Sequence, residues 1–253
     1  MPRGVLITGS EGYVGSSLIP YLTDLEVVTL DRRPASNAHG RLFHVTGDLG
    51  REPDAVREAL DGAPRFDALV HLAANPHAST RWEDLYEDNV LATMHAYELA
   101  REHGIRTIVF ASSVHVVNGY RERPEAWPIG PERLPWPTNA YGVSKIVGEC
   151  FLQMHCDSMP GVRGYALRIG SYWDGRGPLH TYEGADVLFL QAQDFADIVR
   201  RCLNNDGPEG CQRLFCTSRI PQPVLDIEPT RRLLGYEPRH DAATFFPTPP
   251  PRA

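Results

Sequence analysis

The sequence lacks the features that mark metal sites, membrane spans and nucleic-acid binding. Its five cysteines form no C-x-x-C pair and its ten histidines form no H-E-x-x-H motif, so we expect no metal. No uncharged apolar run approaches the roughly 20 residues that a membrane helix needs. The formal net charge of −7 repels a phosphate backbone. We therefore expect neither a membrane nor a nucleic acid as partner.

The start of the chain and its cysteines favour a cytoplasmic protein. Residues 1–5 lead into an apolar run that is too short for a signal peptide and that lacks a cleavage-like site. An odd number of cysteines in such an acidic chain favours reduced thiols, buried as small apolar side chains. A cytoplasmic location is therefore the expectation.

Short apolar runs alternate with amphipathic stretches over about two thirds of the chain. The expected strands are 5–8, 26–30, 68–72, 105–110, 162–169 and 213–216, and the expected helices are 12–22, 54–60, 82–103, 139–154, 194–203 and 229–234. This alternation predicts an α/β fold, a Rossmann-type doubly wound parallel sheet. We expect a dinucleotide-binding domain over residues 1–170, a small substrate-binding lobe over 171–246 and a disordered tail over 247–253.

One segment, 118–138, departs from this alternation. It is rich in proline and holds Trp127 and Trp136. A long proline-rich connection is either a functional lid or a poorly ordered excursion, and the two tryptophans favour a packed loop.

A glycine turn follows the first strand and opens the first helix. Its G-x-x-G-x-x-G spacing places backbone N–H groups where a pyrophosphate can approach. A P-loop is excluded because Ser16 stands where its lysine would be, whereas a merely structural turn remains the alternative. The residues expected to contact a dinucleotide here are Gly9, Glu11, Gly12, Tyr13, Val14 and Gly15.

Asp31 ends the second strand, 22 residues after Gly9. A carboxylate at this place binds the ribose 2′-hydroxyl of NAD and repels a 2′-phosphate. Arg32 and Arg33 follow directly and could pair with such a phosphate, so NAD is favoured and NADP stays open. Further cofactor contacts are expected at the ends of other strands, from Asp48, Leu49, Leu72, Ala73 and Ala74.

Tyr141 and Lys145 are four residues apart on a predicted helix, which stacks them on one face. An ammonium beside a phenol lowers its pKa from about 10. A tyrosine tuned in this way can exchange a proton with an alcohol or a carbonyl near neutral pH. Ser112 and Ser113 end a strand that faces the same crevice, where a hydroxyl can hold the substrate oxygen.

Taken in order, T-G-x-x-G-x-x-G, F-A-S-S, Y-G-V-S-K and L-R-I-G-S resemble the extended short-chain dehydrogenase/reductase family of NAD-dependent epimerases and dehydratases. The resemblance covers most of residues 3–240. It implies that Ser113, Tyr141 and Lys145 are catalytic and that Lys145 also holds the nicotinamide ribose. It adds Asn89, Ser112 and Ile169 to the cofactor-binding residues. It also implies a homodimer formed through helices 82–103 and 139–154.

Few residues lie between Gly170 and the helix at 194, which leaves no docking surface for the nucleotide half of a nucleotide sugar. The layout is most similar to the uronate dehydrogenase branch of the family. Around Glu183 and Gly184, however, no arginine is present to clamp a carboxylate, which favours a neutral sugar or alcohol. Substrate contacts are expected from Asn75, His77, Ser113, Val114, His115, Gly170 and Ser171.

The expected function is that of an NAD(P)-dependent oxidoreductase acting on a small sugar-like or polyol-like alcohol or carbonyl. Hydride moves to or from the nicotinamide while Tyr141 acts as general acid and base. Two alternatives stay open: a sugar epimerase with retained NAD and, less favoured, a non-catalytic dinucleotide sensor.

Overall fold

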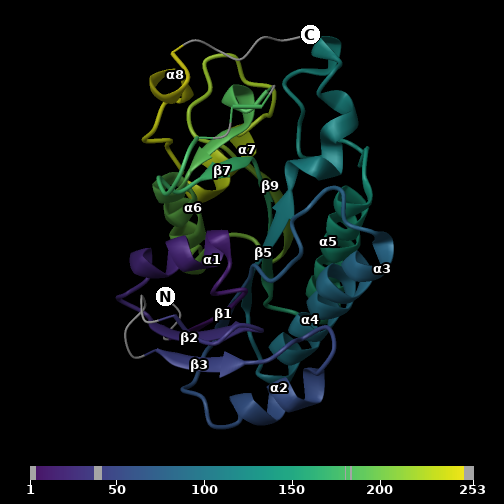
Figure 1. Cartoon of the computed structure of the whole chain (residues 1–253), viewed down its shortest axis with the longest axis vertical. Coiled ribbons are helices and arrows are strands. Elements are labelled where there is room, and N and C mark those ends of the chain that lie inside the picture. Colours follow the sequence, from purple (N-terminus) through teal and green to yellow (C-terminus); the bar gives the residue numbers. More distant parts are fainter. Residues whose placement is uncertain (1–3, 37–41, 180, 183, 248–253) are drawn as a thin grey trace.

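The computed structural model describes residues 4–36, 42–179, 181–182 and 184–247. In this part of the chain, seven parallel strands form one sheet with helices on both faces, as Figure 1 shows. The strands follow one another across the sheet as β3 (Phe43–Thr46), β2 (Glu26–Asp31), β1 (Gly4–Thr8), β4 (Ala68–His71), β5 (Thr107–Ser113), β6 (Arg163–Ile169) and β9 (Gly210–Cys216). The predicted Rossmann-type doubly wound sheet is confirmed.

Both faces of the sheet are buried, which explains the nearly continuous apolar strands. In β1, Val5 and Ile7 belong to one core and Leu6 belongs to the other. The first core is covered by α1 (Tyr13–Leu18), α6 (Ala192–Asn204) and α7 (Glu228–Leu234). The second is covered by α2 (Pro53–Leu60), α4 (Ala92–Glu102) and α5 (Ala140–Ser158). Among the described residues, no helix has the length and apolar character that crossing a bilayer requires.

The predicted helix 82–103 is not continuous. It consists of α3 (Trp82–Leu85), a π-helical turn (Tyr86–Leu91) and α4. The N–H of Ala92 donates to the carbonyl of Glu87, five residues earlier, so the turn holds one residue more than an α-helical turn. Apolar spacing alone did not indicate this insertion, because the segments on both sides keep helical periodicity.

The proline-rich segment is a packed loop, as its tryptophans predict. A 3₁₀ helix, Val114–Tyr120, leads from the end of β5 into the segment, and a second one, Pro124–Ala126, lies within it. The Trp136 ring lies edge-on to Tyr120, with 5.0 Å between the ring centroids. The backbone N–H of Trp136 donates to the Val116 carbonyl (2.8 Å), and the indole N–H of Trp127 donates to the Tyr120 carbonyl (3.2 Å). The loop is thus fixed to the end of β5, next to the predicted catalytic serine.

Segment 171–246 does not stand apart from the main sheet, because β9 pairs with β6 along its whole length. The segment also contains elements that the sequence did not predict. They are a two-stranded parallel sheet of β7 (Ser171–Trp173) and β8 (Phe189–Gln191), a 3₁₀ turn (Asp186–Leu188) and α8 (Ala242–Phe245). A further 3₁₀ turn, Ile19–Tyr21, follows α1. The expected tail, 247–253, lies outside the described residues from 248 onward.

Candidate active site

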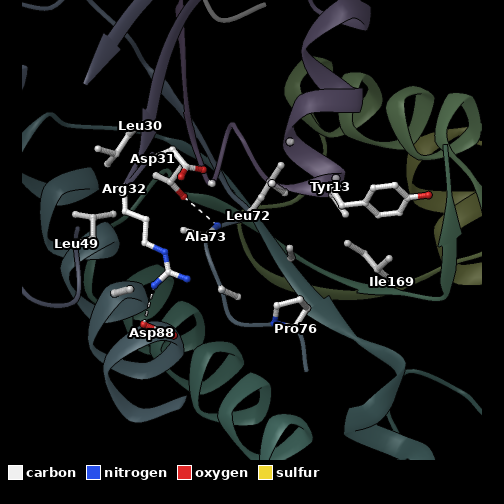
Figure 2. Close-up of a pocket in the computed structure, with 18 of the residues that line it drawn as sticks. Tyr13, Leu30, Asp31, Arg32, Leu49, Leu72, Ala73, Pro76, Asp88 and Ile169 are labelled. Atoms are coloured by element: carbon white, nitrogen blue, oxygen red, sulfur yellow. Dashed lines mark hydrogen bonds and ion pairs between the residues drawn. The ribbon is translucent and has the colours of Figure 1, made fainter. Parts of the chain in front are cut away.

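The strand order places a crevice at the carboxyl ends of β1 and β4, because β2 and β3 extend the sheet from one side of β1 and β4 from the other. A cavity of about 550 Å³ lies in this crevice (Figure 2), a size typical of small-molecule sites. The predicted cofactor residues that line it are Gly9, Gly12, Tyr13, Val14, Gly15, Asp31, Arg32, Asp48, Leu49, Leu72, Ala73, Ala74, Ser112, Tyr141, Lys145 and Ile169.

The glycine turn brings the backbone of β1 against the end of β4. Gly9 has a φ of +72°, and a Cβ there would lie 2.6 Å from the Ala73 backbone nitrogen. A Cβ on Gly15 would overlap the Gly9 carbonyl oxygen. No side chain caps α1 at Gly12, so first-turn N–H groups of the helix remain available to a ligand in the cavity.

Asp31 lies at the opposite end of the cavity from the predicted catalytic residues. Its Oδ2 accepts from the Glu11 backbone N–H (2.9 Å), and its Oδ1 accepts from the Arg33 backbone N–H (3.0 Å) and Nε (3.2 Å). The Glu11 side chain does not line the cavity, and its carboxylate accepts from the Ser36 backbone N–H instead (3.2 Å). Glu11 therefore acts here through its backbone, which orients Asp31.

Ser113, Tyr141 and Lys145 meet at the inner end of the cavity. Asn139 begins α5 by accepting the Gly142 N–H (2.9 Å), which starts the helix directly before Tyr141. The Tyr141 hydroxyl is hydrogen-bonded to the Ser113 side chain. The Lys145 Nζ lies 5.6 Å from the centroid of the Tyr141 ring. This arrangement places a phenol, a hydroxyl and an amine around one point.

The pKa of Tyr141 contradicts the sequence-based expectation of an acidified phenol. Burial raises the pKa of Tyr141 to about 12, and the hydrogen bond from Ser113 opposes this only in part. Burial also lowers the pKa of Lys145 to about 7. Because the same low-dielectric surroundings disfavour the ammonium and the phenolate, the lysine is only partly protonated near pH 7 and burial still raises the pKa of the phenol.

Comparison with known proteins decides the family. The model of the NAD dependent epimerase/dehydratase family matches residues 5–178. The chain belongs to this family. It is 30% identical to L-arabinose 1-dehydrogenase (NAD(P)(+)) of Haloferax volcanii, over 95% of this chain and 98% of that one. It is 32% identical to uronate dehydrogenase of Pseudomonas putida, over 95% and 85% of the two chains.

A solved structure supports the same assignment. The crystal structure of uronate dehydrogenase from Agrobacterium tumefaciens is 28% identical to this chain and superposes with a TM-score of 0.83. The match covers 99% of this chain and 91% of that structure. The resemblance inferred from the motifs, including the similarity in layout to the uronate dehydrogenase branch, is confirmed.

The mid-helix asparagine that the family resemblance added to the cofactor residues, Asn89, does not line the cavity. It is buried in the π-helical turn, where its Nδ2 donates to the Ser144 hydroxyl (2.9 Å) and to the Asn75 carbonyl (3.1 Å). Its Oδ1 accepts from the Asn75 backbone N–H (2.7 Å). Asn89 thus joins the loop after β4 to the helix that carries Tyr141.

Of the expected substrate residues, Ser113 and Gly170 line the cavity, whereas Asn75, His77, Val114, His115 and Ser171 do not. His115 nevertheless lies edge-on to Tyr141, with 5.4 Å between ring centroids. Asn139 Nδ2 lies 2.8 Å from its Nδ1, and burial, followed by the charge of Arg121, lowers the pKa of His115. Val114 is buried in a core cluster that also contains Val116 and Val187.

An arginine lies near Gly184 in the fold although none is near it in the sequence. The guanidinium of Arg121, which belongs to the proline-rich segment, lies against this glycine, where an added Cβ would overlap it. Its charge also reaches His115, as the pKa of that histidine shows. The tertiary fold therefore supplies a cation that the local sequence around Gly184 lacks.

Arg33, which the sequence suggested as a partner of a 2′-phosphate, also lines the cavity, and eight lining residues lie outside the predicted set: Thr8, Leu30, Gly47, Pro76, Asp88, Ala92, Ala111 and Tyr172. Thr8 and Leu30 are the last residues of predicted strands and Ala111 directly follows one, so counting the last residue of each predicted strand and the next one finds these three. Asp88 lies on a helix and not at a strand end. Its place in the cavity wall depends on the π-helical turn, which the sequence did not indicate.

A buried ion pair joins α5, the helix that carries Tyr141 and Lys145, to β6, the neighbour of the strand that ends in Ser113. Arg168 on β6 donates to both carboxylate oxygens of Glu149 on α5, at 2.9 and 2.8 Å. The Ser112 hydroxyl donates to the same carboxylate (2.6 Å). Arg168 also donates to the carbonyl of Pro131 in the proline-rich segment (3.0 Å). One ion pair therefore fixes α5, the end of β5 and the loop relative to one another.

Proposed function

We propose that the protein is an NAD(P)-dependent dehydrogenase that oxidises a hydroxyl of a small sugar or reduces the corresponding carbonyl. The observation that carries this proposal is the buried group of Ser113, Tyr141 and Lys145 at one end of a cavity whose other end presents Asp31. The relatives aligned over nearly the full chain are named as sugar dehydrogenases, which supports net oxidation and reduction over epimerisation.

The residues present fit a dinucleotide. The glycine turn leaves room for a pyrophosphate beside the first-turn N–H groups of α1. Asp31 would accept from a ribose hydroxyl through Oδ2, which receives one hydrogen bond from Glu11. Lys145 would hold the second ribose, and Ile169 and Gly170 would border the nicotinamide. When bound, the nicotinamide supplies the hydride acceptor or donor.

Tyr141 would move the proton at the substrate oxygen. In reduction, the neutral phenol donates its proton to the forming alkoxide, and a raised pKa keeps that proton in place near neutral pH. In oxidation, the phenolate accepts the proton of the alcohol. The Ser113 hydroxyl, already hydrogen-bonded to Tyr141, would hold the same substrate oxygen and orient it.

The substrate class that we propose is a small sugar. The expectation of a neutral sugar depended on the absence of an arginine near Gly184, and the position of Arg121 weakens that argument. The assay therefore measures turnover of neutral aldoses and of uronates separately. Preferred turnover of a uronate, reduced by Arg121→Gln, would assign the acidic class, and preferred turnover of an aldose would assign the neutral class.

The function is tested by incubating the purified protein with NAD⁺ or NADP⁺ and each of a panel of sugars, and measuring the formation of reduced nicotinamide. Tyr141→Phe is expected to lose about 10²- to 10⁴-fold in turnover and to retain dinucleotide binding. The control is Tyr21→Phe, which removes an exposed phenol elsewhere. Full turnover by Tyr141→Phe would refute the proton-transfer role, and interconversion of epimers without net change in the cofactor would replace dehydrogenation with epimerisation.

We also propose that the protein is a cytoplasmic homodimer formed through α3, the π-helical turn and α5. These elements expose Trp82, Tyr86, Val143 and Met154, with Met154 at 61%. Val143 and Met154 are eleven residues apart on α5, which places them on the same side of the helix. Light scattering should give a dimer mass for the wild type and a monomer mass for Met154→Glu; a monomeric wild type would contradict the proposal. Cell fractionation tests the location.

A further inference from the structure

Arg32 and Asp88 face each other across the adenosine end of the cavity. Figure 2 shows the Arg32 side chain reaching from the end of β2 to Asp88 on the π-helical turn. The Nη1 of Arg32 lies 3.4 Å from Oδ1 of Asp88, and both residues line the cavity. The side chain of Arg32 is 58% exposed, whereas that of Asp88 is 10% exposed.

Asp88 is the fixed partner in this pair. Its Oδ1 also accepts from Arg51 Nη1 (2.8 Å), and its Oδ2 accepts from Asn75 Nδ2 (3.2 Å). Both of these contacts are shorter than the contact with Arg32. Since an exposed ion pair at 3.4 Å is weak, Arg32 is the side chain that can change partner.

The second cation at this end of the cavity is also engaged. The Nε of Arg33 lies 3.2 Å from Oδ1 of Asp31, whose side chain is only 6% exposed. The cavity is therefore lined by two guanidinium groups, those of Arg32 and Arg33, and by three carboxylates, those of Asp31, Asp48 and Asp88. Each cation faces a carboxylate, so its attraction for a further anion is largely compensated.

Resting on the proposed function, we propose that Asp88 is a specificity-determining residue: it holds Arg32 away from a 2′-phosphate and so favours NAD over NADP. A 2′-phosphate brings negative charge next to Asp31 and needs a guanidinium to offset the repulsion. Arg32 provides that guanidinium only by leaving Asp88. NAD, with a neutral 2′-hydroxyl, makes no such demand.

The experiment measures the dissociation constants of NAD⁺ and NADP⁺ by titration calorimetry, without any sugar substrate. Asp88→Asn keeps the size of the side chain and removes its charge. We expect NADP⁺ to bind about fivefold more tightly to this variant and NAD⁺ to bind within about twofold of the wild type. Adding Arg32→Gln to Asp88→Asn should abolish the gain for NADP⁺.

Glu87→Gln is the matched control. Glu87 also pairs with Arg51 (2.7 Å) but does not line the cavity, so this variant removes a neighbouring charge and leaves the Arg32–Asp88 pair in place. Its ratio of NADP⁺ to NAD⁺ affinity should equal that of the wild type. An equal gain in Glu87→Gln would show a general charge effect and overturn the role of Asp88.

The single variant Arg32→Gln tests the same idea if Asp88→Asn fails to fold, because Arg32 is mostly exposed. We expect it to weaken NADP⁺ binding less than about twofold, since Asp88 already engages the arginine. A loss of tenfold or more would show that Arg32 binds the phosphate in the wild type. Unchanged affinity ratios in both Asp88→Asn and its double variant would overturn this inference alone, whereas failure of the wild type to bind either dinucleotide would overturn the proposed function as well.

Discussion

Replacing Lys145 by methionine should stabilise the protein while abolishing turnover. Lys145 is 3% exposed on α5, and burial lowers its pKa from 10.5 to about 7. The unfolded chain therefore binds a proton more tightly than the folded chain does. By linkage, this lysine destabilises the fold fully below pH 7, and the penalty fades as the pH rises toward 10.5.

The size of the effect follows from the shift in pKa. At about 1.4 kcal/mol per pKa unit, the penalty is about 4 kcal/mol at pH 7 and about 1 kcal/mol at pH 10. The rings of Phe110 and Tyr141, 5.1 and 5.6 Å from Nζ, offset part of it, by roughly 0.5 to 2 kcal/mol. The free energy of unfolding of Lys145→Met is thus expected to exceed that of the wild type by about 2–4 kcal/mol at pH 7 and by at most about 1 kcal/mol at pH 10.

Urea unfolding of the wild type and Lys145→Met at pH 7 and pH 10 measures this difference. Arg65→Met, which removes an exposed cation, is the control and should show no comparable dependence on pH. Lys145 is also the only lysine in the sequence, so isotope-labelled lysine gives a single side-chain signal whose titration reports the pKa directly. A lysine that titrates near 10.5, or a gain that is equal at both pH values, would refute the reasoning.

Three further outcomes are expected. Glu149→Gln breaks the buried pair with Arg168 and should lower the free energy of unfolding, measured in urea, by about 3–5 kcal/mol. Replacing both partners by apolar residues should restore much of this loss. Gly15→Ala places a methyl against the Gly9 carbonyl and should weaken dinucleotide binding in calorimetry, whereas Gly62→Ala, with nothing within 4 Å, should not. The rate of alcohol oxidation should rise with pH below about 12, the pKa of Tyr141, because the phenolate fraction rises, and a flat profile would contradict this.

The parts of the site that the sequence predicted are those that local spacing determines. The glycine turn lies between a strand and a helix, and Tyr141 and Lys145 are one helical turn apart, so short-range geometry suffices to place them. The direction of the Tyr141 pKa was predicted wrongly because burial, which spacing does not reveal, outweighs the neighbouring amine.

The missed features depend on contacts between distant segments. Arg168 and Glu149 meet only when β6 and α5 pack together, and neither residue alone signals a buried ion pair. Arg121 reaches Gly184 across more than sixty residues of sequence. Asp88 faces the cavity because of an irregular helical turn, for which amino-acid propensity offers no marker comparable to the glycine spacing.

The extra residue in the turn Tyr86–Leu91 has a consequence for how this chain can vary in length. Asp88 lines the cavity, while its neighbour Asn89 donates a hydrogen bond to Ser144 on α5, the helix that carries Tyr141. Loss of one residue here would restore regular winding and move residues of the turn by one helical position, about 100° around the axis, relative to the flanking helices. Single-codon deletions should therefore be rejected at this turn in any functional variant, although an uninterrupted helix would itself be the more regular structure.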